Sequence, residues 1–330
     1  MQHGRSSTIR RTARILSSTR ITSVIRCIAI CATNPPAGKP APTGPWLSDM
    51  KQTENFHGLA ARARAADHDR YMCALFAAPR QRGALFALIL FNAEIARVRE
   101  AVSEPMLGRI RLQWWREAID GIYQGQGRRH EVADPLAEAI RAHGLTRSYF
   151  ERLIDARETD LEDAPPESVA ALEHYAEESA APLVSLALEV AGAEASALSD
   201  VARHVGIGWA LTGLMRGLPH HAAQGRVMLP REVLAAVGLT AQAVMGGEER
   251  PNVARAVASI ADVARHHTRQ ARVYRRALPR AAKRVTLQAV LAGAYLRRLA
   301  DCAHDPYHPR VAIGPLRRQL LLSRAALLGR

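Results

Sequence analysis

The chain has 330 residues, of which 48% are hydrophobic and only 5% aromatic, with a formal net charge of +14 at pH 7. That length and apolar content suffice for one large core or two small ones. Alanine, leucine and arginine are abundant, and these residues favour helices over strands, so the composition predicts an all-α fold. The cysteines form no CxxC pair, which excludes a zinc finger and indicates thiols in a reducing compartment; they are Cys27, Cys31, Cys73 and Cys302.

Residues 1–48 form a basic extension that has no acidic residue. The segment is rich in arginine, serine and threonine, and it resembles a mitochondrial transit peptide, which crosses a membrane as a cationic amphipathic helix. A disordered basic tail and a start codon placed too early are the alternatives. Residues 34–42 then read as a proline-stiffened linker. We therefore expect a basic extension over 1–48 and a folded domain over 49–330, beginning near Asp49.

Helix start and stop signals recur along the body of the chain. Asp134 before Pro135 predicts an N-cap, and Gly144 predicts the stop of the same helix. Ser148 with Glu151 predicts a capping box for the next helix. A further short helix is expected between Pro230 and Gly238. These signals indicate many helices of ordinary length with no repeat period, so a single helical bundle is the simplest architecture. No stretch of the body is apolar enough to span a membrane.

Three segments, residues 69–91, 153–161 and 211–230, resemble the squalene and phytoene synthase family in order and spacing. The most specific of these elements is Gly225-Arg226-Val227-Met228-Leu229-Pro230, which follows a long helix. The resemblance implies an isoprenoid-synthase-type bundle around a central cavity. In the family, two aspartate-rich motifs on facing helices hold magnesium ions, and these ions assist the departure of a diphosphate.

The family's aspartates are largely missing from this sequence. The first motif, two adjacent aspartates and a third three positions later, falls on Ala96, Arg97 and Glu100. The second motif, which follows Arg216, falls on Gly217 and His221. Only Glu100 keeps an acid, so the sequence predicts no confident catalytic residue and no metal site of the family's kind.

Several acidic and basic residues remain as candidates for a role in the cavity. Asp155 and Asp160 are expected to be buried and to pair with Arg97 or Arg216, whereas Glu158, Glu162 and Asp163 are expected on a solvated helix end. Arginines in place of magnesium can bind a phosphate by bidentate hydrogen bonds, so a ligand without chemistry stays open. The full set of cavity or ligand-binding candidates is Glu94, Asp155, Asp160, Arg216 and Arg226.

Residues 94–116 resemble one branch of the family, the mitochondrial respiratory complex I assembly factors with a phytoene-synthase domain and their bacterial relatives. Members of that branch lack intact aspartate motifs, which implies a role in the biogenesis of complex I. Arg111, Trp114 and Trp115 are a candidate partner surface within this block. Tryptophan pairs are also common in cores, and one tryptophan of the pair can serve each purpose.

Two functions of different class follow. The first is a non-catalytic assembly factor that contacts complex I subunits or assembly proteins and needs no cofactor. The second is a prenyl-diphosphate transferase that uses magnesium at a relocated site built from Glu94, Glu100, Asp155 and Asp160. The assembly-factor function predicts a location in the mitochondrial matrix or at the inner-membrane periphery in a eukaryote, and in the cytoplasm or at the membrane periphery in a bacterium.

The C-terminal region from Arg265 onward is strongly basic, and arginines three and four positions apart share a helix face. A solvated face and attraction to an anionic membrane or prenyl lipid are the main readings. Nucleic acid is disfavoured because no binding motif accompanies the charges. The adjacent histidine pairs, His220-His221 and His266-His267, diverge too far around a helix to share one metal ion.

Overall fold

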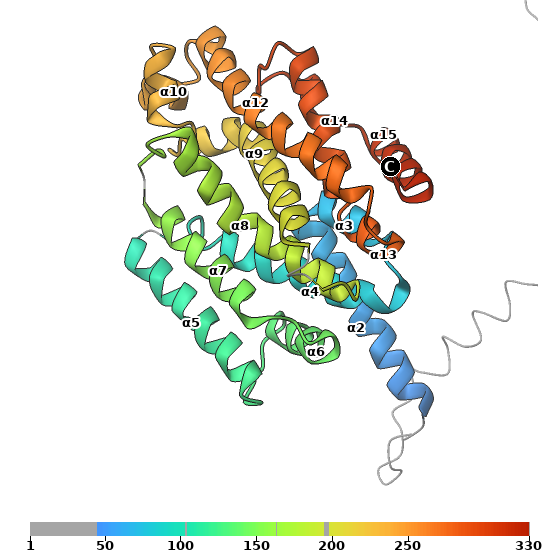
Figure 1. Cartoon of the computed structure of the whole chain (residues 1–330). Coiled ribbons are helices and arrows are strands. Elements are labelled where there is room, and N and C mark those ends of the chain that lie inside the picture. Colours follow the sequence, from blue (N-terminus) through green and yellow to red (C-terminus); the bar gives the residue numbers. More distant parts are fainter. Residues whose placement is uncertain (1–44, 103, 163, 195–197, 330) are drawn as a thin grey trace, which may run out of the picture. The chain divides into compact units, whose positions relative to one another are not determined.

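The computed structural model describes residues 45–102, 104–162, 164–194 and 198–329. Every regular element within these residues is a helix (Figure 1). The basic segment up to residue 44, with its proline-rich linker, lies outside the described residues, as do Cys27, Cys31 and Asp163. The helices are α2 Pro45–Ala66, α3 His68–Ala74, α4 Pro79–Ala96, α5 Pro105–Tyr123, α6 Ala133–His143, α7 Arg147–Glu158, α8 Val169–Val190, α9 Ser199–Ala223, α10 Arg231–Ala236, α11 Ala241–Met245, α12 Arg250–Arg275, α13 Arg280–Val285, α14 Gln288–Asp301 and α15 Pro315–Leu328, with 3₁₀ turns at Thr159–Leu161 and Pro309–Val311.

The residues from Thr53 onward form one compact unit, and the predicted single all-α bundle is confirmed. Asp49 lies within α2, and the domain boundary near it stays a prediction. The three long helices α8, α9 and α12 pack side by side at the centre of this unit, with α9 between the other two (Figure 1). Helix α4 is buried along most of its length because its residues from Ala84 to Phe91 are all apolar.

Helices α8 and α9 approach each other closely where α9 carries a glycine. A Cβ atom at Gly206 would lie 2.6 Å from both the Cα and the backbone nitrogen of Ala181 on α8. Pro182 follows Ala181 inside α8, where a proline removes one backbone hydrogen bond. Glycine is therefore required at position 206 for the two backbones to reach this separation.

Local helix signals were predicted with mixed success. Gly144 ends α6 in the left-handed conformation, at φ 61°, and Pro230 precedes α10 with Gly238 just beyond its end, as predicted. The predicted N-cap at Asp134 is wrong, because α6 already begins at Ala133 and the acid lies in its first turn.

The capping box predicted for Ser148 is also wrong. Helix α7 begins two residues earlier than an N-cap at Ser148 implies, at Arg147, and its N-cap is Thr146. Glu151 pairs with Arg147, at 2.7 Å between Oε1 and Nε. The Thr146 hydroxyl donates to Glu189 on α8 instead of capping α7, so this start is fixed by a contact between helices.

Within the described residues, no helix combines the length and apolar character that crossing a membrane requires. Cys73 and Cys302 are free thiols, and Cys73 is buried. Burial is the main reason that the pKa of the Cys73 thiol is raised, so this thiol is protonated at neutral pH.

Candidate functional site

A cavity of about 310 Å³ opens between α3, α4, α7, α8 and α9. It lies where the family resemblance places the two aspartate motifs, since both motif segments contribute to its walls. Ala96 and Arg97 come from the end of α4, and Gly213 and His221 come from α9. The remaining lining residues are Ala66, Asp67, Arg70, Asn92, Ala93, Arg157, Tyr175, Ser179, Ala180, Trp209, Ala210 and Leu214.

The walls of this cavity carry more positive than negative charge. Among the described residues that line it, Arg70, Arg97 and Arg157 are basic and Asp67 is the one acid. The carboxylate of Asp67 is already paired with Arg70, because it accepts hydrogen bonds from the Arg70 backbone at 2.8 Å and from the Arg70 guanidinium at 2.7 Å. Magnesium prefers several hard oxygen ligands, so this wall does not fit the metal cluster that the family implies.

The first motif ends at the C-terminus of α4. Arg97 is the C-cap residue of this helix. Its Nη2 donates a hydrogen bond to the carbonyl oxygen of Ala66, at 3.4 Å. Glu100, the acid that the motif retains, is turned toward His220 on α9, with 3.8 Å between Oε1 and Nε2. The two motif segments therefore do face each other, but the acid that the first motif retains meets the imidazole of His220, next to the second motif's His221, instead of another carboxylate.

In the second motif, the side chain of His221 packs against Gly217, four residues earlier on α9. A Cβ atom at Gly217 would lie 3.1 Å from Cε1 of His221, so the imidazole packs over the bare backbone of the glycine. Burial, and then the nearby charge of Arg226, lower the pKa of His221. His221 is consequently neutral at pH 7, and it adds no negative charge to the wall.

Asp160 lies beside the cavity at the centre of a buried polar cluster. Its Oδ1 accepts from Arg226 Nη2 at 2.6 Å and from the Tyr175 hydroxyl at 2.6 Å, and its Oδ2 lies 3.2 Å from Arg157 Nη1. Arg157 also donates to Tyr175 at 3.1 Å and to the Ser179 carbonyl at 3.3 Å. The predicted burial of Asp160 is confirmed, with only 3% of the residue exposed.

The charges around Asp160 keep it ionised. Burial alone would raise the pKa of this carboxyl, but Arg157 and Arg226 outweigh burial and hold the pKa below its ordinary value. Burial and the neighbouring carboxylate raise the pKa of Tyr175 to about 12, so the phenol stays a donor. With both oxygens occupied by three partners, Asp160 is not free to bind a metal ion.

The predicted partners of Asp160 were wrong, and so was the predicted burial of Asp155. Asp155 is exposed on α7, where it accepts from Arg116 of α5 at 2.7 Å. Arg216 points to a different set of partners: its guanidinium lies 3.4 Å from the centre of the Tyr295 ring and 3.6 Å from Oδ2 of Asp69. Residues a few positions apart on α7 and α9 thus face different neighbours, which sequence spacing alone does not reveal.

The four carboxylates of the relocated metal site do not come together. Asp155 and Asp160 are held by separate arginines, Glu100 faces His220, and Glu94 is half-buried on α4 and absent from the cavity lining. No group of three or more histidine, cysteine, aspartate or glutamate side chains in the described part of the chain could hold one metal ion. The relocated site was therefore a wrong prediction.

Sequence reasoning missed two polar residues of this site, Tyr175 and Asn92. Tyr175 is the single Phe, Trp or Tyr residue of α8, but nothing in the sequence ties it to an aspartate fifteen positions earlier. Asn92 is 8% exposed on α4 and lines the cavity, and its Oδ1 has no hydrogen-bond partner among the described residues. Its position directly after the apolar run from Ala84 to Phe91 was the available signal for it.

The candidate partner surface is divided between core and exterior. Trp115 is 4% exposed and packs edge-on against Phe91, with ring centres 5.3 Å apart, so its assignment to a surface was wrong. Trp114 is half-buried and lies against His130, at 4.9 Å between ring centres, and Arg111 is exposed. The accessible part of the surface is therefore Arg111 with one side of Trp114.

The squalene/phytoene synthase family model matches residues 63–324. The assembly factor 6 of NADH dehydrogenase (ubiquinone) complex I from Bos taurus is 33% identical over 156 residues, which cover 47% of this chain and 47% of that protein. A presqualene diphosphate synthase from Rhodopseudomonas palustris is 29% identical over 162 residues, which cover 48% of this chain and 57% of that protein.

The chain spans about half the length of these curated relatives. Among solved structures, a dehydrosqualene synthase in complex with a ligand aligns with a TM-score of 0.74 at 13% identity, over 84% of this chain and 98% of the other. A likeness at that identity establishes the fold, and the family model extends over most of the sequence. On both grounds, the chain belongs to the squalene/phytoene synthase family.

Proposed function

We propose that this protein is a non-catalytic member of its family that acts in the assembly of respiratory complex I (NADH dehydrogenase). The observation that carries the proposal is the charge of the cavity wall, where three arginines and one committed aspartate stand in place of two clusters of free carboxylates. A diphosphate leaves when concentrated positive charge stabilises it, and the family places that charge on magnesium. Without ligands for the metal, the cavity cannot perform that step in the family's way.

The named relatives support the assembly role. The bovine relative is an assembly factor of complex I, and the stretch in common covers about half of each protein. We infer from this likeness that the partners of the present chain are complex I subunits or other assembly proteins. A matrix or inner-membrane location in a eukaryote, or a cytoplasmic or membrane-peripheral one in a bacterium, follows from the same role.

We place the partner contact on the outer face of α5. Ile110 and Met106 are each 59% exposed, and Leu107 is 46% exposed, beside the accessible Arg111 and Trp114. Clusters of exposed apolar side chains with an adjacent arginine and tryptophan are the usual anchors of protein interfaces. This face is therefore the first place at which to test binding of an assembly partner.

The test of the assembly role is genetic. We expect deletion of the gene to lower the amount of assembled complex I on native gels, and the wild-type gene to restore it. Met106→Glu with Ile110→Glu is expected to fold and yet to fail in rescue, because charge on an apolar interface is costly. The matched control carries Ala170→Glu and Ala171→Glu, two exposed positions in the first turn of α8. Equal rescue by both variants would remove α5 as the partner surface.

The enzyme alternative keeps one supporting observation, the 29% identity to a presqualene diphosphate synthase. It is tested by incubating the full chain with farnesyl and geranylgeranyl diphosphates and magnesium while following inorganic diphosphate and extracted lipid. We expect no magnesium-dependent release of diphosphate. Coupled prenyl product from the pure protein would contradict the non-catalytic proposal, whatever the outcome of the genetic test.

A further inference from the structure

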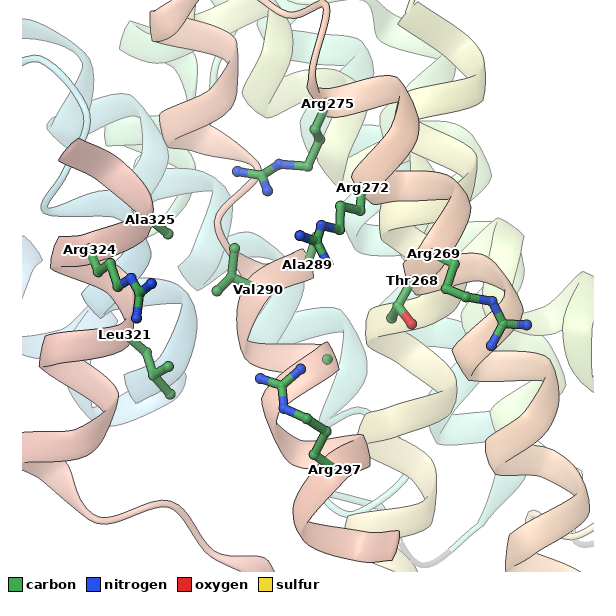
Figure 2. A pocket seen from close by; sticks show the side chains of 11 residues that line it. Thr268, Arg269, Arg272, Arg275, Ala289, Val290, Arg297, Leu321, Arg324 and Ala325 are labelled. Atoms are coloured by element: carbon green, nitrogen blue, oxygen red, sulfur yellow. The ribbon is translucent and has the colours of Figure 1, made fainter. Parts of the chain in front are cut away.

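A second cavity, of about 390 Å³, lies between α12, α14 and α15, on different elements from the family cavity (Figure 2). Its polar lining consists of arginines from all three helices, together with Thr268. Figure 2 shows the guanidinium groups of Arg272, Arg297 and Arg324 directed into the space between the helices, whereas Arg269 points away from it. Three separate helices thus deliver positive charge to one place.

These charges have no acidic partner in the part of the chain that the structure describes. None of the described lining residues is acidic, and Arg272, Arg297 and Arg324 make no ion pair there. Arg275, at the inner end of the cavity, is buried, and it donates to Thr286 and to the Lys283 carbonyl, each at 3.0 Å. Burial lowers the pKa of Arg275 to about 10, which leaves it charged at neutral pH.

Like charges gathered in one cavity repel one another, so their arrangement favours an anion that accepts hydrogen bonds from several guanidinium groups. A phosphate group does so, because its oxygens match the planar fork of an arginine. The rest of the lining is apolar, from Ala289, Val290, Leu321 and Ala325. A ligand with a phosphate and an adjoining hydrocarbon part fits this combination better than a free phosphate ion.

The outer face of α15 points to the source of that phosphate. Leu316, Leu320 and Leu327 are 77%, 70% and 74% exposed, and spacings of four and seven residues place them in one stripe along the helix. Arg324 lies between this stripe and the cavity on the helix surface. Exposed leucines beside basic residues are the pattern of a helix that rests in the interface of a membrane.

We propose that the cavity between α12, α14 and α15 binds the phosphate of an anionic phospholipid while the leucine stripe of α15 enters the membrane surface. In this proposal the phosphate accepts hydrogen bonds from the guanidinium groups of Arg272, Arg297 and Arg324, which Figure 2 shows directed into the cavity. The acyl chains continue toward the leucines. This inference goes beyond the assembly role and does not depend on it, since it concerns where the protein is held.

The experiment measures binding of the full chain to vesicles of phosphatidylcholine with and without phosphatidylglycerol, by co-sedimentation. Each arginine near an anionic surface contributes about fivefold to the partition constant, so Arg272→Gln/Arg297→Gln/Arg324→Gln should bind about a hundredfold less. The matched control replaces three exposed arginines elsewhere, Arg109→Gln/Arg129→Gln/Arg255→Gln, and should bind like the wild type. An equal loss in both triple variants would mean diffuse attraction of charge, and it would overturn the proposal.

A second variant separates a lipid from a free phosphate ion. Leu316→Ser/Leu320→Ser/Leu327→Ser is expected to keep its folded circular dichroism spectrum, because the three leucines are exposed, and to lose vesicle binding several-fold. Inorganic phosphate at millimolar concentration is expected to leave the wild type on the vesicles. If phosphate instead displaces the protein while the leucine variant binds vesicles normally, the cavity is a site for the free ion and the lipid proposal fails.

Discussion

Asp160 connects three parts of the chain that are far apart in sequence. Its carboxylate meets Arg157 from the end of α7, Tyr175 from α8 and Arg226 from the loop after α9. Arg226 belongs to the most specific family element, so that element serves here to close a polar core. These contacts join α7, α8 and the loop after α9 beside the cavity, although Glu100 is the one motif acid that the sequence retains.

At the residue scale, we predict that Asp160→Asn lowers the free energy of unfolding by about 3 to 5 kcal/mol at pH 7, since two arginines are left without their counter-charge in a buried site. Urea denaturation checks this value. Glu162→Gln is the matched control, because Glu162 is a nearby exposed acid, and its effect should stay within about 0.5 kcal/mol. A loss below 1 kcal/mol for Asp160→Asn would show that the cluster does not stabilise the fold.

The difference in the free energy of unfolding between the wild type and Asp160→Asn should also depend on pH. The pKa of Asp160 is lower in the folded state than in the unfolded state, where it is about 3.9. The stabilisation is therefore fully present above about pH 4 and is lost as the pH falls through the folded pKa. Urea titrations repeated at decreasing pH should show the two proteins converging only in strong acid, and convergence near neutral pH would contradict the ion-pair account.

At the scale of whole helices, the sequence predicted where some helices end, but it did not predict which face of a helix is buried. Gly144 and Pro230 act on their own backbone, so the sequence located the helix ends at which they stand. Asp155 and Asp160 are five positions apart near the end of α7, yet one faces α5 at the surface and the other is buried. Which face of α7 is covered depends on how α5 and α8 pack against it, and a single sequence does not encode that contact in any local pattern.

The contact between α8 and α9 gives the prediction that belongs to this scale. Gly206→Ala should lower the free energy of unfolding by about 1 to 3 kcal/mol or more, because the new methyl group would meet the backbone of α8 at 2.6 Å and a backbone cannot turn aside. Gly213→Ala on the same helix meets nothing within 4 Å, and it should add about 1 kcal/mol through helix propensity. Thermal unfolding of the two variants tests this, and a matching shift in both would contradict the close approach at Gly206.

The whole molecule has the architecture of a prenyl synthase but lacks most of the acidic charges of the two aspartate motifs. The fold class, the central cavity and the loss of the aspartates were all predictable, because they rest on the chain-wide resemblance and on residue identity at motif positions. The second cavity was only partly foreseen. The sequence indicated a basic C-terminal region, but the meeting of arginines from α12, α14 and α15 depends on how three helices pack together.

If the missing carboxylates alone disable the metal site, restoring them should restore binding of magnesium. We predict that Ala96→Asp/Arg97→Asp/Gly217→Asp/His221→Asp gains a magnesium affinity measurable by calorimetry, whereas the wild type has none. The change at Gly217 needs the change at His221, because the imidazole of His221 would meet the new Cβ at 3.1 Å. Together the four substitutions add four negative charges and remove the positive charge of Arg97.

The matched control for this variant carries asparagine at the same four positions, which gives nearly the same shape without the charges. It should bind no magnesium, since a hard divalent cation requires carboxylates to offset the loss of its water shell. Equal binding by the aspartate and asparagine variants would locate the metal elsewhere. Binding by the unaltered chain would mean that Glu100 and neighbouring oxygens suffice, and the cavity would then have kept the means to assist the departure of a diphosphate.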